Sequence, residues 1–267
     1  MFDSHCHLQF EAFDHDRDEV LRRSVEAGLN GILLADYDST RRDLLQELTR
    51  IEGLFATAGL HPWAVASYDD AALRKELERL GEALDSGVFC GVGELGLDFY
   101  RCKDEAGRAL QERAFVAQLG MAREKNLPVV IHAVKCHNTL IKVLRREGLP
   151  QRGGFLHGYS GSPRQAGTFL MMNLDLSIGT PLTFGNPSAK LQEVVRQIPL
   201  DRLLVETDAP DRPPGGYHGE RNEPPYLNVV IQAVARLKGE RPERIAAQGE
   251  QNIRDRFSLG EECLRLH

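Results

Sequence analysis

Short apolar segments alternate with longer amphipathic segments eight times along this chain. Apolar runs bounded by glycine, proline and polar residues predict buried β-strands, and apolar residues at helical spacing between them predict helices. In the first amphipathic segment, Val20, Leu21 and Val25 recur among charges before Gly28 and Asn30 end the pattern. The expected strands cover residues 2–7, 31–35, 54–59, 88–93, 128–132, 154–157, 174–177 and 203–206. The expected helices cover residues 16–27, 39–50, 71–84, 105–125, 138–146, 162–172, 187–197 and 225–238, with an extra C-terminal helix at 242–257.

This alternation of strand and helix predicts an α/β protein with a parallel sheet. Eight units whose strands are apolar enough for burial on both faces favour a closed (β/α)8 TIM barrel over an open doubly wound sheet. No GxGxxG motif follows the first expected strand, which disfavours a dinucleotide-binding fold. No Ser/Gly/Pro-rich linker divides the sequence, so we expect residues 1–267 to form one domain.

Composition narrows the possible partners and the compartment. The formal net charge is −6, so no uniform cationic field would attract a polyanion, and any contact with nucleic acid must be local. The five cysteines lack CxxC spacing and are odd in number, which favours a reducing compartment over a disulfide framework. The start of the chain does not resemble a signal peptide, and no apolar run approaches about 18 residues. We therefore expect a cytoplasmic protein without membrane contact.

Histidines and carboxylates recur where the expected strands end. In a parallel barrel all strands end on one face, so side chains at these positions should meet at one mouth. Successive strand residues point to opposite sides, so His5 and His7 should face the same way while Cys6 faces the other. The candidate metal ligands are His5, His7, Glu94, His132, His157 and Asp208.

A single histidine at the end of a strand is more often a hydrogen-bonded structural residue than a metal ligand. Six histidines and carboxylates at strand ends around one mouth are far less probable by chance. The remaining histidines show the contrast, because they fall in helical or loop sequence and are assigned no role. These are His15, His137, His218 and His267. His61 follows the third expected strand, and two roles stay equally open for it: a substrate contact or a loop hydrogen bond.

Glu94 is suited to bridge two cations, because a shared carboxylate offsets their repulsion at a separation of about 3.5–4 Å. We expect His5, His7, Glu94 and Asp208 around one ion, and Glu94, His132 and His157 around the other. Bound cations lower the pKa of coordinated water to about 7, and Asp208 would orient that water or take its proton. Glu94 and Asp208 are therefore the expected catalytic residues. Glu206 is either an outer partner of the ligands or an ordinary solvated or ion-paired carboxylate.

Seven short motifs occur along the chain in the same order as in a known protein family. The chain resembles the TatD family of metal-dependent hydrolases, particularly its YjjV-type branch. The resemblance implies a TIM barrel, a two-metal centre that uses the six ligands above, and hydrolysis of phosphodiester bonds. Some members of the family are magnesium-dependent deoxyribonucleases that trim DNA from the 3′ end. The motifs, from residue 3 onward, are DSHCHL (3–8), GLHP (59–62), GELGLD (93–98), LPVVIH (127–132), HGYSG (157–161), ETDAP (206–210) and RNEP (221–224).

Three departures from the family pattern affect the expected substrate contacts rather than the metal ligands. Valine occupies position 134, where the family often has arginine; the neighbouring Lys135 could replace that guanidinium only as a point charge. HGYSG replaces the usual HCFSG at residues 157–161. Asp211 stands where an apolar or aromatic residue is commoner, and a carboxylate there would disfavour a polyanion unless Arg212 pairs with it.

These observations predict a deoxyribonuclease, most simply a 3′–5′ exonuclease, that acts on DNA ends or short oligonucleotides. His61 and Arg221 are the expected phosphate contacts, and Tyr100 or Tyr159 could stack on a base or simply pack in the protein. Magnesium is expected for turnover, while the imidazole ligands favour zinc, manganese, cobalt or nickel by affinity. A hydrolase of small-molecule esters or amides, such as aminoacyl linkages, is the alternative, and a non-catalytic metal protein is a third. The oligomeric state stays open, and a monomer is compatible with the sequence.

Overall fold

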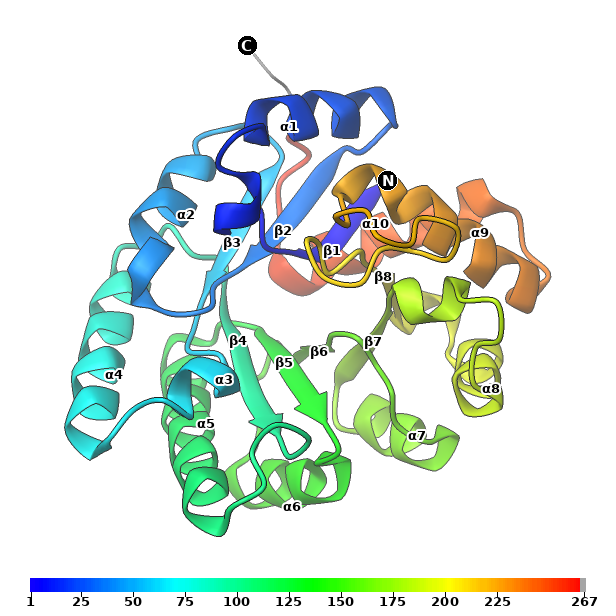
Figure 1. The fold of residues 1–267 in the computed structure, drawn as a ribbon. Coiled ribbons are helices and arrows are strands. Elements are labelled where there is room, and N and C mark those ends of the chain that lie inside the picture. Colours follow the sequence, from blue (N-terminus) through cyan, green and yellow to red (C-terminus); the bar gives the residue numbers. More distant parts are fainter. Residues whose placement is uncertain (265–267) are drawn as a thin grey trace.

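A computed structural model describes residues 1–264 of the chain. Its eight parallel strands lie side by side in sequence order and form a nearly closed barrel, shown in Figure 1. The predicted fold class is therefore confirmed. The strands are β1 (Phe2–Cys6), β2 (Gly31–Ala35), β3 (Leu54–Ala58), β4 (Gly91–Asp98), β5 (Val129–Val134), β6 (Gly154–Leu156), β7 (Leu174–Ile178) and β8 (Leu203–Val205).

Helices connect consecutive strands and surround the barrel (Figure 1). The short helix α3, which begins with a proline directly after His61, is an element that the sequence pattern did not predict. The extra C-terminal helix is present as α10. The helices are α1 (Arg17–Glu26), α2 (Arg42–Leu48), α3 (Pro62–Val65), α4 (Asp70–Asp85), α5 (Glu105–Lys125), α6 (His137–Glu147), α7 (Pro163–Met171), α8 (Ala189–Gln197), α9 (Leu227–Lys238) and α10 (Pro242–Phe257). None of the helices among residues 1–264 is both long and apolar enough to cross a membrane.

The barrel closes between β1 and the residues that follow β8. The Asp208 N–H donates to the carbonyl of His5 at 2.9 Å, and the His7 N–H donates to the carbonyl of Ala209 at 2.8 Å. The Ser4 hydroxyl also donates to the carbonyl of Val205 at 2.9 Å. These contacts join the first and last strands where both end, so they place Asp208 beside the two histidines of the first strand segment.

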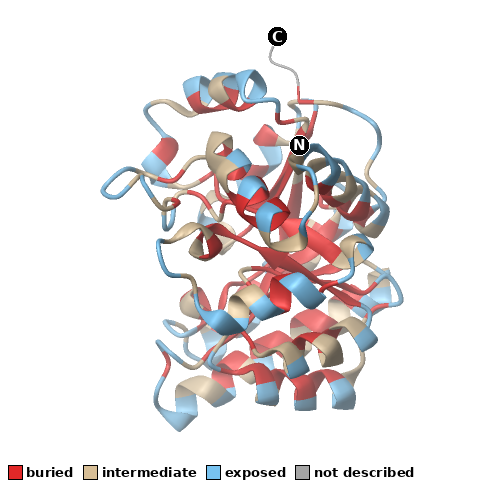
Figure 2. Ribbon diagram, turned by 90° about the vertical axis from the view of Figure 1, so that its right-hand side faces the viewer, coloured by how far each residue is buried: buried red, intermediate tan, exposed pale blue. Residues whose placement is uncertain are grey.

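The buried residues concentrate in the strands and on the inner faces of the helices, and the exposed residues lie on the outer faces, as Figure 2 shows. Every residue of β2 is buried. This burial on both faces is the reason why the strands read as continuous apolar runs in the sequence.

Strand β4 differs from its expected bounds, 88–93, because it runs from Gly91 to Asp98. Gly93 and Gly96 have low strand propensity, so the sequence pattern predicts that the strand ends at Gly93. In the structure β4 continues to pair with β5 through Asp98, with a register shift between Val92 and Leu95. Glu94 is therefore held inside a paired strand rather than in the loop after it.

A buried ion-pair cluster joins β7 to the C-terminal helix. Asp175 is 2% exposed and accepts hydrogen bonds from Arg256 at 2.7 and 2.8 Å and from Arg202. Loss of this carboxylate would leave two guanidinium groups without their shared anion.

We expect Asp175→Ala to lower the free energy of unfolding by about 3 kcal/mol, the lower end of the cost of breaking a buried ion pair, since Arg202 is partly exposed. Denaturant unfolding with an unchanged m-value would measure it. Asp201→Ala, at an exposed position next to Arg202, is the control. A difference between the two variants below about 1 kcal/mol would contradict a stabilising role for this cluster.

Candidate metal centre

All six predicted ligands lie together at the carboxyl ends of the strands. His5 lies in β1, Glu94 in β4 and His132 in β5. His7 and His157 follow directly after β1 and β6, and Asp208 lies three residues after the end of β8. Five of the six are at most 8% exposed, and Asp208 alone reaches the opening, with 31% of its side chain exposed. The barrel thus buries a set of nitrogen and oxygen donors that would be unfavourable without a cation or a proton between them.

The first group of donor atoms consists of Glu94 Oε2, His5 Nε2, His7 Nε2 and Asp208 Oδ1. Glu94 Oε2 lies 3.2 Å from His5 Nε2 and 3.5 Å from His7 Nε2, and Asp208 Oδ1 lies 3.5 and 3.6 Å from the same nitrogens. The two imidazole nitrogens are 3.1 Å apart. Four ligands at the usual zinc distances lie about 3.3 Å from one another, so these spacings fit a divalent cation.

The second group surrounds the other oxygen of the same carboxylate. Glu94 Oε1 lies 2.7 Å from His132 Nδ1, 2.8 Å from His157 Nε2 and 3.1 Å from His61 Nε2. Glu94 therefore faces both groups, one oxygen to each, as expected for a bridging ligand. The sequence analysis did not include His61 in this donor group.

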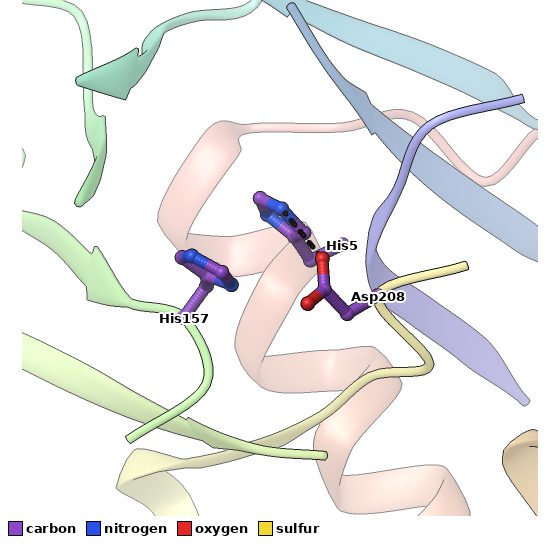
Figure 3. A group of neighbouring side chains, drawn as sticks. All are labelled: His5, His157 and Asp208. Carbon is purple, nitrogen blue, oxygen red and sulfur yellow. Dashed lines mark ion pairs between the residues drawn. The ribbon is translucent and has the colours of Figure 1, made fainter. Parts of the chain in front are cut away.

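His157 also approaches the first group. Its ring stacks on that of His5, with centroids 4.0 Å apart, and Figure 3 shows both rings beside Asp208. Donor atoms of His5, His157 and Asp208 all lie within 4.8 Å of one another. The two groups are therefore adjacent, because His157 contacts Glu94 Oε1 in the second group and stacks on His5 in the first.

Two of the histidines have a hydrogen-bond acceptor on the ring nitrogen that points away from the centre, and a third faces a carboxylate there. His7 Nδ1 lies 2.9 Å from the carbonyl of Ala35, and His132 Nε2 lies 3.3 Å from Asp98 Oδ2. His157 Nδ1 faces Glu206 Oε1 at 3.6 Å, beyond hydrogen-bonding distance. An acceptor there holds the ring proton on the outer nitrogen, which leaves a lone pair directed at the metal position. This is the arrangement expected of neutral imidazole ligands.

His61 has the opposite arrangement. Its Nδ1 accepts the backbone N–H of Trp63 at 3.0 Å and so caps α3. Burial lowers the pKa of His61 to about 4, even though the nearby Glu94 acts to raise it. The neutral ring must therefore carry its proton on Nε2, which points at Glu94. His61 makes a loop hydrogen bond through Nδ1, and its Nε2–H faces Glu94 Oε1 at 3.1 Å at the centre. Both roles left open by the sequence, a loop hydrogen bond and a substrate contact, are therefore compatible with the structure.

The charges in the centre are strongly coupled. Burial alone would raise the pKa of Glu94, but the surrounding His157, His61 and His5 lower it well below its usual range. Burial likewise acts to raise the pKa of Asp208, while a hydrogen bond from His7 and the charges of the histidines bring it down to about 2. Both carboxylates are therefore ionised at neutral pH, as metal ligands must be.

Asp98 is a residue of this site for which the sequence analysis predicted no role. Besides facing His132, its Oδ2 accepts the indole N–H of Trp63 at 2.6 Å. Asp98 belongs to the GELGLD motif but lies beyond the expected end of the strand at Gly93. Its position at the end of β4, four residues and thus two strand periods after Glu94, was the signal that could have identified it.

Arg221, an expected phosphate contact, has protein partners in the structure. Its guanidinium pairs with Asp16 at 2.7 Å and Glu223 at 2.7 Å, and it lies over the ring of Phe13. Its contact with substrate stays a prediction. Lys135 is exposed and does not line the metal pocket, whereas Asp211 and Arg212 do.

The two tyrosines differ. Tyr159 is 3% exposed, packs against His137 and Phe169 and donates its hydroxyl hydrogen to the carbonyl of Ser162, so it is a packing residue. Tyr100 is 62% exposed and lines the metal pocket.

The histidines without an assigned role lie apart from the donor groups. His15 and His218 are exposed, and His137 is buried beside Tyr159. His267 lies outside the described residues. Glu206 is fully buried, accepts the Gly158 N–H at 2.5 Å and faces His157, which agrees with an outer partner of a ligand and excludes a solvated carboxylate.

A TIM barrel that gathers histidines and carboxylates at the carboxyl ends of its strands defines a metal-dependent hydrolase. Comparison with known proteins gives the family. The family model described as TatD related DNase matches residues 2–258, and the chain belongs to this family.

Relatives along the whole chain agree with this assignment. The metal-dependent hydrolase YabD of Bacillus subtilis is 33% identical over 262 residues, which cover 97% of this chain and 99% of YabD. The 3′–5′ ssDNA/RNA exonuclease TatD of Erwinia amylovora is 34% identical over 269 residues, 97% of this chain and 100% of that protein. The crystal structure of YjjV from Escherichia coli has a TM-score of 0.88 at 31% identity and covers 97% of this chain and 98% of its own.

Proposed function

We propose that this protein is a cytoplasmic 3′–5′ exonuclease that hydrolyses phosphodiester bonds at DNA ends with two divalent cations. The observation that carries the proposal is the Glu94 carboxylate, whose two oxygens each face one of two neighbouring donor groups at 2.7–3.5 Å. A pair of cations suits phosphodiester cleavage because it offsets charge on both the attacking and the leaving oxygens. Relatives that carry an exonuclease name support the choice of substrate.

His5, His7, Asp208 and Glu94 would hold one cation, and Glu94, His132 and His157 the other. When bound, such ions lower the pKa of coordinated water and neutralise phosphate charge. Asp208 reaches the opening and is ionised, so it can accept a proton from an attacking water. His61 holds a proton on Nε2 and can donate a hydrogen bond to a phosphoryl oxygen.

We expect His61→Asn to lower kcat about 100-fold or more, the usual cost of removing one preorganised donor. Asparagine can still accept the Trp63 N–H with its side-chain oxygen, so the cap of α3 persists, while the donor at Nε2 is lost. Metal analysis should show two ions per chain before and after the change. A variant with normal kcat would limit His61 to its capping role, and a loss of metal would make it a ligand instead.

A second candidate is a hydrolase of small-molecule esters or amides. The metal pocket has a volume of about 330 Å³ and is lined by four carboxylates, those of Asp98, Glu206, Asp208 and Asp211. A small and acidic pocket suits a neutral or cationic compound better than a long polyanion.

Digestion of oligonucleotides labelled at either the 3′ or the 5′ end distinguishes these functions. The protein would be stripped with a chelator and reloaded separately with magnesium, manganese, zinc, cobalt or nickel. We expect stepwise loss of the 3′ label, no activity in the stripped protein and the highest turnover with magnesium. Hydrolysis of an aminoacyl ester panel with intact oligonucleotides would overturn the proposal and support the second candidate.

A further inference from the structure

Arg101 stacks on the ring of Trp63 at the edge of the metal pocket. It follows β4, and its guanidinium carbon lies 3.4 Å from the centroid of the Trp63 ring. Asp98 fixes both partners, because Oδ2 accepts the Trp63 indole N–H at 2.6 Å and Oδ1 accepts the Arg101 backbone N–H at 2.9 Å. The same carboxylate faces the ligand His132. The Arg101–Trp63 pair is thus connected to the metal centre through a single buried side chain.

The Arg101–Trp63 pair also stands where three clefts meet. One is the metal pocket of about 330 Å³, one is a larger cleft of about 850 Å³ beside α4 and α5, and the third, of about 470 Å³, runs along Gln9–Ala12. Both Arg101 and Trp63 line all three clefts. A substrate that extends from the metal pocket into either neighbouring cleft would contact this pair.

The guanidinium of Arg101 is available to an anion. It forms no ion pair with any carboxylate among residues 1–264, whereas Arg221 is held by Asp16 and Glu223. The carboxylates of the larger cleft are already engaged: Asp69 and Asp104 cap α4 and α5, and Asp70 pairs with Arg113.

We propose that Arg101, stacked on Trp63, is an anion subsite that binds the phosphate next to the one at the metal ligands. Stacking on an aromatic ring fixes the plane of a guanidinium while its N–H groups stay free for two parallel hydrogen bonds to phosphate. This inference rests on the proposed function and makes it more specific, because a second anion subsite selects a substrate with two phosphates over a neutral ester. It also assigns to Arg101 the role that the sequence assigned to Arg221.

Trp63 is the only tryptophan in the chain, so intrinsic fluorescence reports directly on this subsite. The probes are thymidine 5′-phosphate, with one phosphate, and thymidine 3′,5′-bisphosphate, with two; neither contains a phosphodiester bond. In the metal-loaded protein we expect the second phosphate to tighten binding about tenfold or more, the value of a charge-assisted contact. Calorimetry provides the same constants independently of the fluorescence baseline.

In Arg101→Gln the two probes should bind with nearly equal affinity, and Arg101→Lys should keep part of the difference. KM for a thymidine trinucleotide should rise about tenfold in Arg101→Gln, with kcat within a few-fold of wild type and two metal ions per chain. Arg145→Gln removes the same charge at an exposed position on α6 and is the matched control.

An unchanged preference for the bisphosphate in Arg101→Gln would overturn the anion subsite. An equal loss in Arg145→Gln would also overturn it, because the effect would then follow net charge. If the wild-type protein discriminates the probes through Arg101 but cleaves no oligonucleotide, the proposed function fails while the subsite stands.

Discussion

Glu94→Gln should abolish hydrolysis and prevent the binding of both metal ions. The carboxylate lies within 3.5 Å of five histidine nitrogens, and each of its two oxygens faces one of the two donor groups. Glutamine has nearly the same shape, but it supplies one neutral acceptor and one donor, so it cannot bridge two cations. Groups that merely orient a ligand cost about 10- to 100-fold in activity or metal affinity, and loss of the bridge should cost more than 100-fold in both.

Metal content and kcat, measured on the same preparations, check this expectation. Glu76→Gln is a suitable control, since Glu76 is also largely buried but pairs with Arg79 on the outer helix α4. Circular dichroism should show the folded barrel in both variants. A Glu94→Gln protein that still binds two ions per chain would rule out the bridging arrangement.

Asp208→Asn should lower kcat more than about 100-fold but leave one of the two metal positions occupied. Asp208 Oδ1 lies 3.5 and 3.6 Å from the nitrogens of the first donor group, and Glu94, His132 and His157 of the second group stay in place. The change also removes the ionised carboxylate at the pocket opening that is expected to accept the proton of the attacking water. Asp208→Asn should therefore lose activity while it still binds one metal ion, whereas Glu94→Gln should lose both activity and metal.

Titration of the stripped protein with manganese or zinc would give the number of ions bound per chain, and single-turnover assays would give the rate of the chemical step. We expect a stoichiometry near one and a slow chemical step. Asp43→Asn, at an exposed position on α2, is the control. Normal turnover in Asp208→Asn would remove this residue from the reaction and leave proton transfer to another group.

The Glu94→Gln and Asp208→Asn variants together test whether the centre holds two ions that share one bridging carboxylate. If the centre holds two ions that share Glu94, removal of the bridge must affect both positions, whereas removal of a terminal ligand affects one. A centre with one ion would give the same stoichiometry change for both variants.

The gathering of the six donor side chains at one mouth could be predicted from the sequence because each position depends on local information. His5, His132 and Asp208 each lie at the end of an apolar run, and parallel strands bring such ends to one mouth whatever the details of the loops. The bounds of β4 could not be predicted, since Gly93 and Gly96 interrupt the run and only pairing with β5 keeps the strand going. Asp98 was missed for the same reason.

The sequence by itself determined the eight-unit barrel and the six donors, because periodicity and strand ends are properties of short segments. Only the tertiary structure decided which nitrogen of His61 carries its proton, that Arg221 has protein partners and that Arg101 has no carboxylate partner among residues 1–264. These outcomes depend on which groups from distant parts of the chain lie within hydrogen-bonding distance. Hydrogen bonds and ion pairs act over a few ångströms, so the roles of polar side chains are set by neighbours that the linear sequence does not specify.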